Sequence, residues 1–376
     1  MSWVSSQFEL SRHGSSPVVL PMEGLRGFAV FLVFLAHYVS LISPWITKGG
    51  VLDNTAEAIH SIGNVGVDLF FVLSGYLIYA SIMTRRQSFL RFMRRRVARI
   101  YPAFCVVFAV YLLLSFVVPG QSKIRGEGLP ALIYILQNFL LLPGLFPIEP
   151  IITVAWSLSY EMFFYLAIPL TVAALRLREC SSQLRVVFFI TVASAIAIYC
   201  GINGGHVRLI MFIAGILLHE ALHKRLIPVP HSIFAIIVLL AGLGLTAIQV
   251  PGPLAFTCRV VALFVTFFIV CYVCFSRVDA WVARLFSITP LRWLGNMSYS
   301  YYLLHGLSLK LAFAALFLKL PHVEHQFFAF VMLMPVMFVL SLLPAAGLFL
   351  LVERPLSLIQ ALPSSVGTPV IPVVKA

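Results

Sequence analysis

The chain is short of charged residues. Of its 376 residues only 10% are Asp, Glu, Lys or Arg, whereas 61% are hydrophobic and the mean hydropathy is +1.01. A soluble globular domain carries about 25% charged residues, so this composition excludes a water-soluble fold. It predicts an all-α protein, a polytopic bundle of membrane-spanning helices.

Acidic residues are scarcer still. There are 13 of them against 26 Lys and Arg, which leaves a net charge of +13. The basic residues lie in short loops between apolar runs, as the positive-inside rule describes, so we expect membrane lipids and not nucleic acid as partners. Residues 1–20 contain no basic start followed by an apolar stretch, so we expect no cleaved signal peptide.

Metal-binding patterns are weak, and we expect no metal site. The CxxC of Cys271 and Cys274 has no second pair and no nearby histidine ligands. His219 and His223 have helical metal-ligand spacing and Glu220 follows the first histidine, but the helix-end position and the missing further residues of a zinc-hydrolase motif make this pattern weak.

Long apolar runs dominate the chain. They occur at about 24–43, 64–83, 98–118, 131–146, 154–175, 186–200, 207–222, 230–248, 255–275, 293–317 and 327–351. The loop 84–99 holds seven arginines and should be cytoplasmic. The basic loop 176–185 obeys the same rule only if 131–146, which Pro143 and Gly144 interrupt, is re-entrant. We therefore predict ten spanning helices, one re-entrant segment and both termini in the cytoplasm.

The same pattern predicts the domain organisation. Residues 1–20 form a cytoplasmic segment, 21–356 form one membrane domain, and 357–376 form a cytoplasmic tail with the composition of a disordered end. We see no internal repeat of the kind found in many transporters.

Arg26 and His37 stand in an otherwise apolar run, GLRGFAVFLVFLAHYVSLI. Ionisable residues inside a spanning segment are costly and indicate function. Eleven residues is close to three helical turns, so both side chains share a face and lie roughly 16 Å apart. With Arg26 at the membrane surface, His37 falls near the midplane.

Two acidic residues lie at membrane depth. Asp68, one of three aspartates, should lie about two turns into its helix from the outer side, and Glu161 at a similar depth in WSLSYEMFFY. For each, pairing with a membrane cation and direct chemistry on a substrate are about equally supported by the sequence.

Further polar and aromatic residues are candidates for a site. Arg96 and Arg99 share a helical face and could hold phosphates, although this loop taken alone favours a topology signal. The others are Ser74, Tyr76, Trp156, Tyr160, Tyr302 and His305. For Ser74 a packing role is favoured, because the small Ser74-Gly75 pair allows close helix contact.

Taken in order, these motifs resemble acyltransferase family 3. The resemblance rests on Arg26-x10-His37, GVDLFFVLSGYLI, Arg96-x2-Arg99 followed by IYP, WSLSYEMFFY, SYSYYLLH and the closing Glu353-Arg354-Pro355. It covers about residues 20–356 and is similar to the stand-alone type, without a C-terminal esterase-like domain.

The resemblance implies an enzyme of the bacterial inner membrane, multi-pass, that O-acylates carbohydrates. It implies no bound cofactor, acyl-CoA (usually acetyl-CoA) as co-substrate, and a carbohydrate or glycolipid acceptor such as O-antigen. On this basis Arg26, Arg96 and Arg99 would bind acyl-CoA on the cytoplasmic side. Catalysis would fall to His37, as general base or acyl carrier, with Glu161 and Asp68 facing the acceptor on the outer half.

Two other classes of protein share part of this pattern. A transporter or flippase of a lipid-linked sugar also uses charges inside the membrane, but the missing repeat counts against it. A non-catalytic binding protein would be expected to lose the pair Arg26 and His37, which is intact here.

Overall fold

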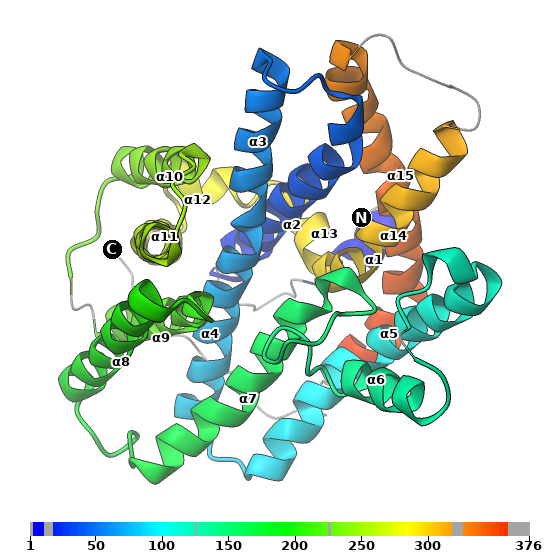
Figure 1. The fold of residues 1–376 in the computed structure, drawn as a ribbon. Helices are drawn as coiled ribbons and strands as arrows, with labels where there is room; N and C mark the ends of the chain where they lie inside the picture. Colours follow the sequence, from blue (N-terminus) through cyan, green and yellow to red (C-terminus); the bar gives the residue numbers. More distant parts are fainter. Residues whose placement is uncertain (1–2, 11–17, 125, 225–226, 318–325, 360–376) are drawn as a thin grey trace.

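A computed structural model describes residues 3–10, 18–124, 126–224, 227–317 and 326–359. Within these ranges the chain is helical, with connecting turns and no β-strand (Figure 1). Seven helices there are long and apolar enough to cross a membrane, namely Val19–Trp45, Val51–Thr84, Phe89–Val117, Thr153–Ala174, Ser182–Asn203, Pro253–Ser276 and Phe330–Leu358. The all-α polytopic membrane bundle is thus confirmed, while the count of ten spans and the side of the termini stay predictions.

Helix α2 (Val19–Ile42) carries Arg26 and His37 and makes close backbone contacts with neighbouring helices on two sides. A Cβ on Gly27 would lie 1.9 Å from the carbonyl oxygen of Leu291 in α13 (Thr289–Asn296), and a Cβ on Gly66 of α4 would lie 2.4 Å from that of Ala29. Glycine is therefore required at both contacts, and these contacts set how deep Arg26 lies.

Helices α3 (Val51–Asn64) and α4 (Gly66–Thr84) follow one another with a single-residue break at Val65. Together they make an apolar helical stretch of 34 residues. Asp68 therefore lies near the middle of this stretch, in the first turn of α4, and its distance from the outer membrane surface stays a prediction. The polar residues of α3 lower its hydropathy, so the search for apolar runs did not predict this helix.

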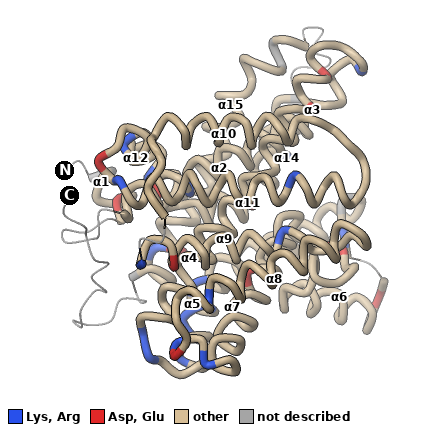
Figure 2. The backbone as a smooth tube through the Cα atoms, turned by 90° about the vertical axis from the view of Figure 1, so that its left-hand side faces the viewer, with Lys and Arg blue, Asp and Glu red and all other residues tan. Residues whose placement is uncertain are grey.

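Helix α5 (Phe89–Val117) begins inside the segment that we expected to be a loop. The side chain of Ser88 caps it by accepting a hydrogen bond from the backbone N–H of Arg91, 3.4 Å away. Most of the loop arginines thus lie on the first turns of α5, and Figure 2 shows Lys and Arg gathered there beside the end of α4.

Helix α6 (Leu129–Phe139) has 11 residues, about 16 Å of helix, which is too short to cross a bilayer of about 30 Å. An irregular segment follows, in which Gly144 has φ +94° and packs against the backbone of Trp156. Helix α7 (Trp156–Ala174) consequently begins deep within the molecule (Figure 1).

The remaining helices complete the bundle. They are α8 (Ser182–Asn203), α9 (Ile210–Lys224), α10 (Ser232–Ala247), α11 (Pro253–Ser276), α12 (Trp281–Leu285), α14 (Ser298–Phe317) and α15 (Leu333–Leu348), which continues as the π-helix η6 (Phe349–Ile359). The run predicted over 293–317 is therefore two helices that meet at Met297. A short helix, α1 (Trp3–Phe8), precedes α2, and the predicted tail lies outside the described residues from 360 onward.

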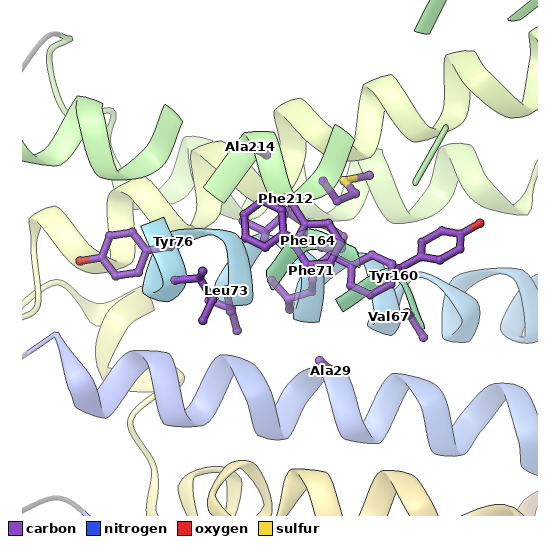
Figure 3. Close-up of a cluster of buried hydrophobic side chains, with 14 of the residues drawn as sticks. Ala29, Val67, Phe71, Leu73, Tyr76, Tyr160, Phe164, Phe212 and Ala214 are labelled. Atoms are coloured by element: carbon purple, nitrogen blue, oxygen red, sulfur yellow. The ribbon is translucent and has the colours of Figure 1, made fainter. Parts of the chain in front are cut away.

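A stack of aromatic rings fills the space between α4, α7 and α9 (Figure 3). The Phe212 ring centroid lies 4.6 Å from that of Phe71 and 4.4 Å from that of Phe164. Phe71 also stacks on Tyr160 at 5.8 Å. This buried core holds α4 and α7 in the register that builds the site below.

Candidate active site

A cavity of about 200 Å³ lies between α2, α4, α5, α7 and α14. Six residues that the sequence singled out line it, namely Arg26, Ser74, Arg96, Arg99, Glu161 and Tyr302. We call it the arginine cavity. It brings together side chains from five helices, and only Arg96 and Arg99 are close in sequence.

The three arginines are held in three different ways. Arg26 donates a hydrogen bond to Ser298 Oγ at 2.8 Å. Arg99 forms an ion pair with Glu353 of η6, with Nη1 2.6 Å from Oε1. Arg96 lies over the rings of Phe92 and Tyr165, and its buried Nε has no hydrogen-bond partner among the described residues. A buried donor without a partner is unusual. The Nε–H group of Arg96 is therefore available to an anionic ligand in the cavity.

Glu161 belongs to the same cavity and not to the opposite half of the membrane. Its Oε1 accepts hydrogen bonds from Ser74 Oγ, at 2.8 Å, and from the hydroxyl of Tyr165. The prediction that Glu161 lies away from the arginines is therefore wrong. The reason is the deep start of α7, because the short α6 and the segment after it do not bring the chain back to the outer surface.

His37 lies outside the arginine cavity and next to His305. The two ring centroids are 4.6 Å apart with the rings nearly perpendicular. The ring of Tyr302, which lines the cavity, is 5.8 Å from that of His305. Tyr302 and His305 thus lie between the cavity and His37. His305 itself is fully buried, whereas His37 is partly exposed.

The hydrogen bonds of the two histidines define their tautomers. His37 Nδ1 lies 2.9 Å from the carbonyl oxygen of Val33, and His305 Nδ1 lies 2.9 Å from that of Tyr302. A carbonyl oxygen only accepts, so each Nδ1 carries the proton. In the neutral rings each Nε2 then has a free lone pair, as a general base requires.

Asp68 lies outside the arginine cavity and is paired with a cation, one of the two roles expected for it. Its Oδ1 is 3.7 Å from Nε of Arg208, and neither carboxylate oxygen has a hydrogen-bond partner among the described residues. The Arg208 guanidinium lies over the Trp156 ring at 5.6 Å. Tyr160 OH bonds to His206 Nδ1 at 2.6 Å. We call this group the Asp68 cluster.

Tyr76 is placed away from both groups. Its ring packs against Phe275, with centroids 5.4 Å apart, and against His219 at 6.0 Å. Figure 3 shows it at the opposite end of the aromatic cluster from Val67, which lines the arginine cavity. Among the described residues, the structure gives Tyr76 packing contacts and does not place it in the lining of the arginine cavity.

The sequence reading did not assign roles to several residues of these groups. Glu353 stands two residues after the last predicted apolar run, a signal that a search for charges beside apolar runs could have used. Arg208 lies at the start of the apolar run predicted over 207–222 and was not singled out. Ser298 and Tyr165 carry no signal beyond their neighbourhood, because only the fold brings them to the cavity.

Comparison with known families agrees with this arrangement. A family model described as an acyltransferase domain, acyltransferase 3, matches residues 21–349. The chain belongs to acyltransferase family 3. The match includes both histidines and all three arginines of the arginine cavity, so the geometry described here is that of a multi-pass membrane acyltransferase.

Curated relatives are similar over part of their length. An O-acetyltransferase, OatA, of Staphylococcus aureus is 31% identical over 175 residues, which are 43% of this chain and 26% of that protein. The acyltransferase MdmB of Streptomyces mycarofaciens is 32% identical over 154 residues, 40% of this chain and 38% of MdmB. The peptidoglycan O-acetyltransferase OatA of Listeria monocytogenes is 28% identical over 327 residues, 77% of this chain and 49% of that protein. The chain thus spans at most about half of each of these relatives, and no solved structure matches it significantly.

Proposed function

We propose that this acyltransferase is an O-acetyltransferase of the bacterial inner membrane. In this proposal it moves an acetyl group from cytoplasmic acetyl-CoA to a hydroxyl group of a carbohydrate or glycolipid acceptor. The observation that carries the proposal is the arginine cavity, where three arginine side chains from α2 and α5 converge. The rings of Tyr302 and His305 connect this cavity to His37. The O-acetyltransferase relatives support the choice of acetyl and of oxygen as the accepting atom.

The arginines would bind the anionic part of the donor. Guanidinium groups form paired, charge-assisted hydrogen bonds to phosphate oxygens. Arg96, whose Nε is without a protein partner, and Arg26 would meet the diphosphate. Arg99 would be oriented by Glu353, whose Oε2 also accepts a hydrogen bond from Ser300 N at 3.0 Å.

His37 would act on the acceptor. Its Nε2 accepts the hydroxyl proton while the oxygen attacks the thioester carbonyl; the C–O bond forms, the C–S bond breaks, and the CoA thiolate leaves and takes up a proton. The same Nε2 could instead attack the thioester and carry the acetyl group as an acyl-imidazole to an acceptor further out. An intact-mass measurement of enzyme given acetyl-CoA alone distinguishes the two routes, because only the second adds an acetyl group to the protein.

The Asp68 cluster is the proposed acceptor side. Trp156 and Tyr160 offer flat faces of the kind on which sugar rings stack, and Arg208 lies over Trp156. Ring-bearing side chains beside a charged pair suit a polyhydroxylated molecule with few apolar groups. Asp68 would orient the acceptor hydroxyl through its unpartnered oxygens.

The test is the variant His37→Ala in purified protein. We expect release of free CoA thiol in the presence of acceptor to fall at least about 100-fold, the range for a lost general base. Acetyl-CoA binding should be retained, because His37 does not line the arginine cavity. His223→Ala, an exposed histidine of α9, is the matched control and should behave as wild type.

Transfer at the wild-type rate by His37→Ala would refute the assignment of His37. A wild-type protein that moves a lipid-linked sugar across vesicles but releases no CoA thiol would instead identify the transporter alternative. Mass spectrometry of surface glycans from cells with and without the gene would then identify the acceptor by its acetyl mass difference.

A further inference from the structure

A second cavity, of about 280 Å³, lies next to the arginine cavity. Its lining comes from the end of α4, the start of α5, the end of α7 and the turn that follows α7. We call it the outer-turn cavity, defined by Ile82, Gln87, Phe92, Pro169, Arg176 and Arg178 among its lining residues. The proposed function does not use it.

The two cavities are stacked along one groove between α4, α5 and α7. On each helix, a residue of the arginine cavity is followed one turn away by a residue of the outer-turn cavity. These pairs are Ile78 and Ile82 on α4, Arg96 and Phe92 on α5, and Tyr165 and Pro169 on α7. One turn of four residues is about 6 Å. A ligand only slightly longer than this step can occupy both cavities.

The layer between the cavities is thin and made of side chains. Phe92 separates them, with Arg96 lying over its ring at 5.2 Å and the ring of Tyr165 6.4 Å away. A ligand that occupies both cavities would therefore have to displace the side chain of Phe92.

The arginine cavity alone is too small for an entire acyl-CoA. Pockets for drug-sized ligands measure about 300–1,000 Å³, whereas this one measures about 200 Å³. It can take the diphosphate, from which the acyl end would extend toward His37, but the adenosine 3′-phosphate needs further space. The outer-turn cavity adds about 280 Å³ of space beside the arginines of α5.

The polar groups of the outer-turn cavity fit an adenine nucleotide. Both amide atoms of Gln87, Nε2 and Oε1, are buried and have no hydrogen-bond partner among the described residues. A side-chain amide pairs with the adjacent donor and acceptor on the edge of adenine. Phe92 and Ile82 supply an apolar wall for the base.

The charge of the cavity suits a phosphate. Arg176 and Arg178 line it together with a single acid, Glu179. Arg178 is engaged by the backbone, because it donates to the carbonyl oxygen of Ile82 at 2.8 Å. Arg176 is exposed and is therefore the residue placed to meet a phosphate at the mouth.

We propose that the outer-turn cavity is the subsite for the adenosine 3′-phosphate end of the acyl donor. In this subsite Gln87 forms hydrogen bonds with the adenine base and Arg176 binds the 3′-phosphate. This rests on the proposed function, because it assumes that acetyl-CoA is the donor. It adds a recognition site that would make the enzyme prefer the full donor over one that ends at the pantetheine phosphate.

The experiment compares two donors, acetyl-CoA and acetyl-4′-phosphopantetheine, on the full chain in phosphatidylcholine nanodiscs. We expect Gln87→Leu and Arg176→Gln each to weaken acetyl-CoA binding about tenfold, the effect of one lost hydrogen bond or phosphate contact of about 1.4 kcal/mol. Binding and turnover of the truncated donor should stay at the wild-type level, which also shows that the variants fold.

Arg94→Gln is the matched control. Arg94 is an exposed arginine of the same basic stretch that lines neither cavity, so its loss removes one charge without touching the subsite. We expect less than a twofold change for either donor.

Three results would overturn the proposal. Gln87→Leu could bind acetyl-CoA as tightly as wild type, or Arg94→Gln could weaken it as much as Arg176→Gln does. Phosphatidylglycerol in the nanodiscs could compete with acetyl-CoA in wild type but not in Arg176→Gln, which would identify the cavity as a lipid headgroup site. A wild-type protein that uses neither donor would instead refute the proposed function.

Discussion

At the scale of single residues, the buried charges of this protein fall into two kinds. Arg185 is fully paired, with Nε 2.7 Å from Glu220 Oε1 and Nη2 2.9 Å from Oε2. Arg96 has a buried Nε without a hydrogen-bond partner among the described residues. The first arrangement serves the fold, because every strong donor is used. The second leaves a binding group free to meet a ligand, which is the physical reason to seek function at Arg96.

The ion pair of Arg99 and Glu353 gives a prediction at this scale. Arg99 has 23% of its side chain exposed, whereas Glu353 is fully buried. Removing the arginine therefore leaves a buried carboxylate without its partner. Breaking a buried ion pair in this way lowers the free energy of unfolding by about 3–5 kcal/mol. We expect Arg99→Met to lower the stability in detergent more than Glu353→Gln does, as measured by thermal unfolding.

The double variant Arg99→Met/Glu353→Gln is the control for this pair. It should be more stable than the sum of the two single effects indicates, because neither charge is then left alone. Strict additivity of the two losses would contradict the interpretation that the pair is energetically coupled.

At the scale of helices, small residues set the distances between neighbouring helices. A Cβ on Gly75 of α4 would lie 2.2 Å from the carbonyl oxygen of Phe212, and one on Gly215 of α9 would lie 2.1 Å from that of Val72. Such small-residue contacts let helices in a membrane approach closely. The α4–α9 contact in turn fixes α4, whose Ser74 faces the arginine cavity.

The variant Gly75→Ala should therefore destabilise the protein, although alanine favours helices. We expect a loss of about 1–3 kcal/mol, the usual cost of overpacking. The control is Gly244→Ala on α10, where a Cβ would meet nothing within 4 Å. There the higher helix propensity of alanine should leave the stability unchanged or raise it by up to about 1 kcal/mol. Equal thermal shifts for the two variants would contradict the argument.

At the scale of the whole molecule, charge determines orientation. Figure 2 shows Lys and Arg concentrated where α4 ends and α5 begins. Lys48, before α3, and Arg86, after α4, are exposed at the two ends of a helical stretch of 34 residues. That stretch is about 51 Å long, longer than a bilayer with its headgroups.

The two ends should therefore face opposite compartments. In a background with the six cysteines replaced, we expect Arg86→Cys to react with a membrane-impermeant maleimide only after the cells are opened. Lys48→Cys should react in intact spheroplasts. Labelling of both positions from the same side would refute the predicted topology.

The sequence by itself determined the class of this protein and much of its chemistry. Low charge and long apolar runs are properties of composition, so the all-α membrane fold could be predicted from them. The family followed from motifs in a fixed order. Charges inside apolar runs identified Arg26 and Glu161, because such residues are costly wherever the chain places them, and Arg96 and Arg99 were identified by their shared helical face.

Only the tertiary structure decided which of these residues meet. Hydropathy reports where a helix is apolar but not where its neighbour begins, so the deep start of α7 and the helical α3 were missed. Glu161 consequently lies with the arginines, and Asp68 pairs with Arg208. The contact of His37 with His305, and the stacking of the two cavities, depend on the depth and tilt of packed helices. Backbone contacts at glycines set that depth, and sequence periodicity does not encode it.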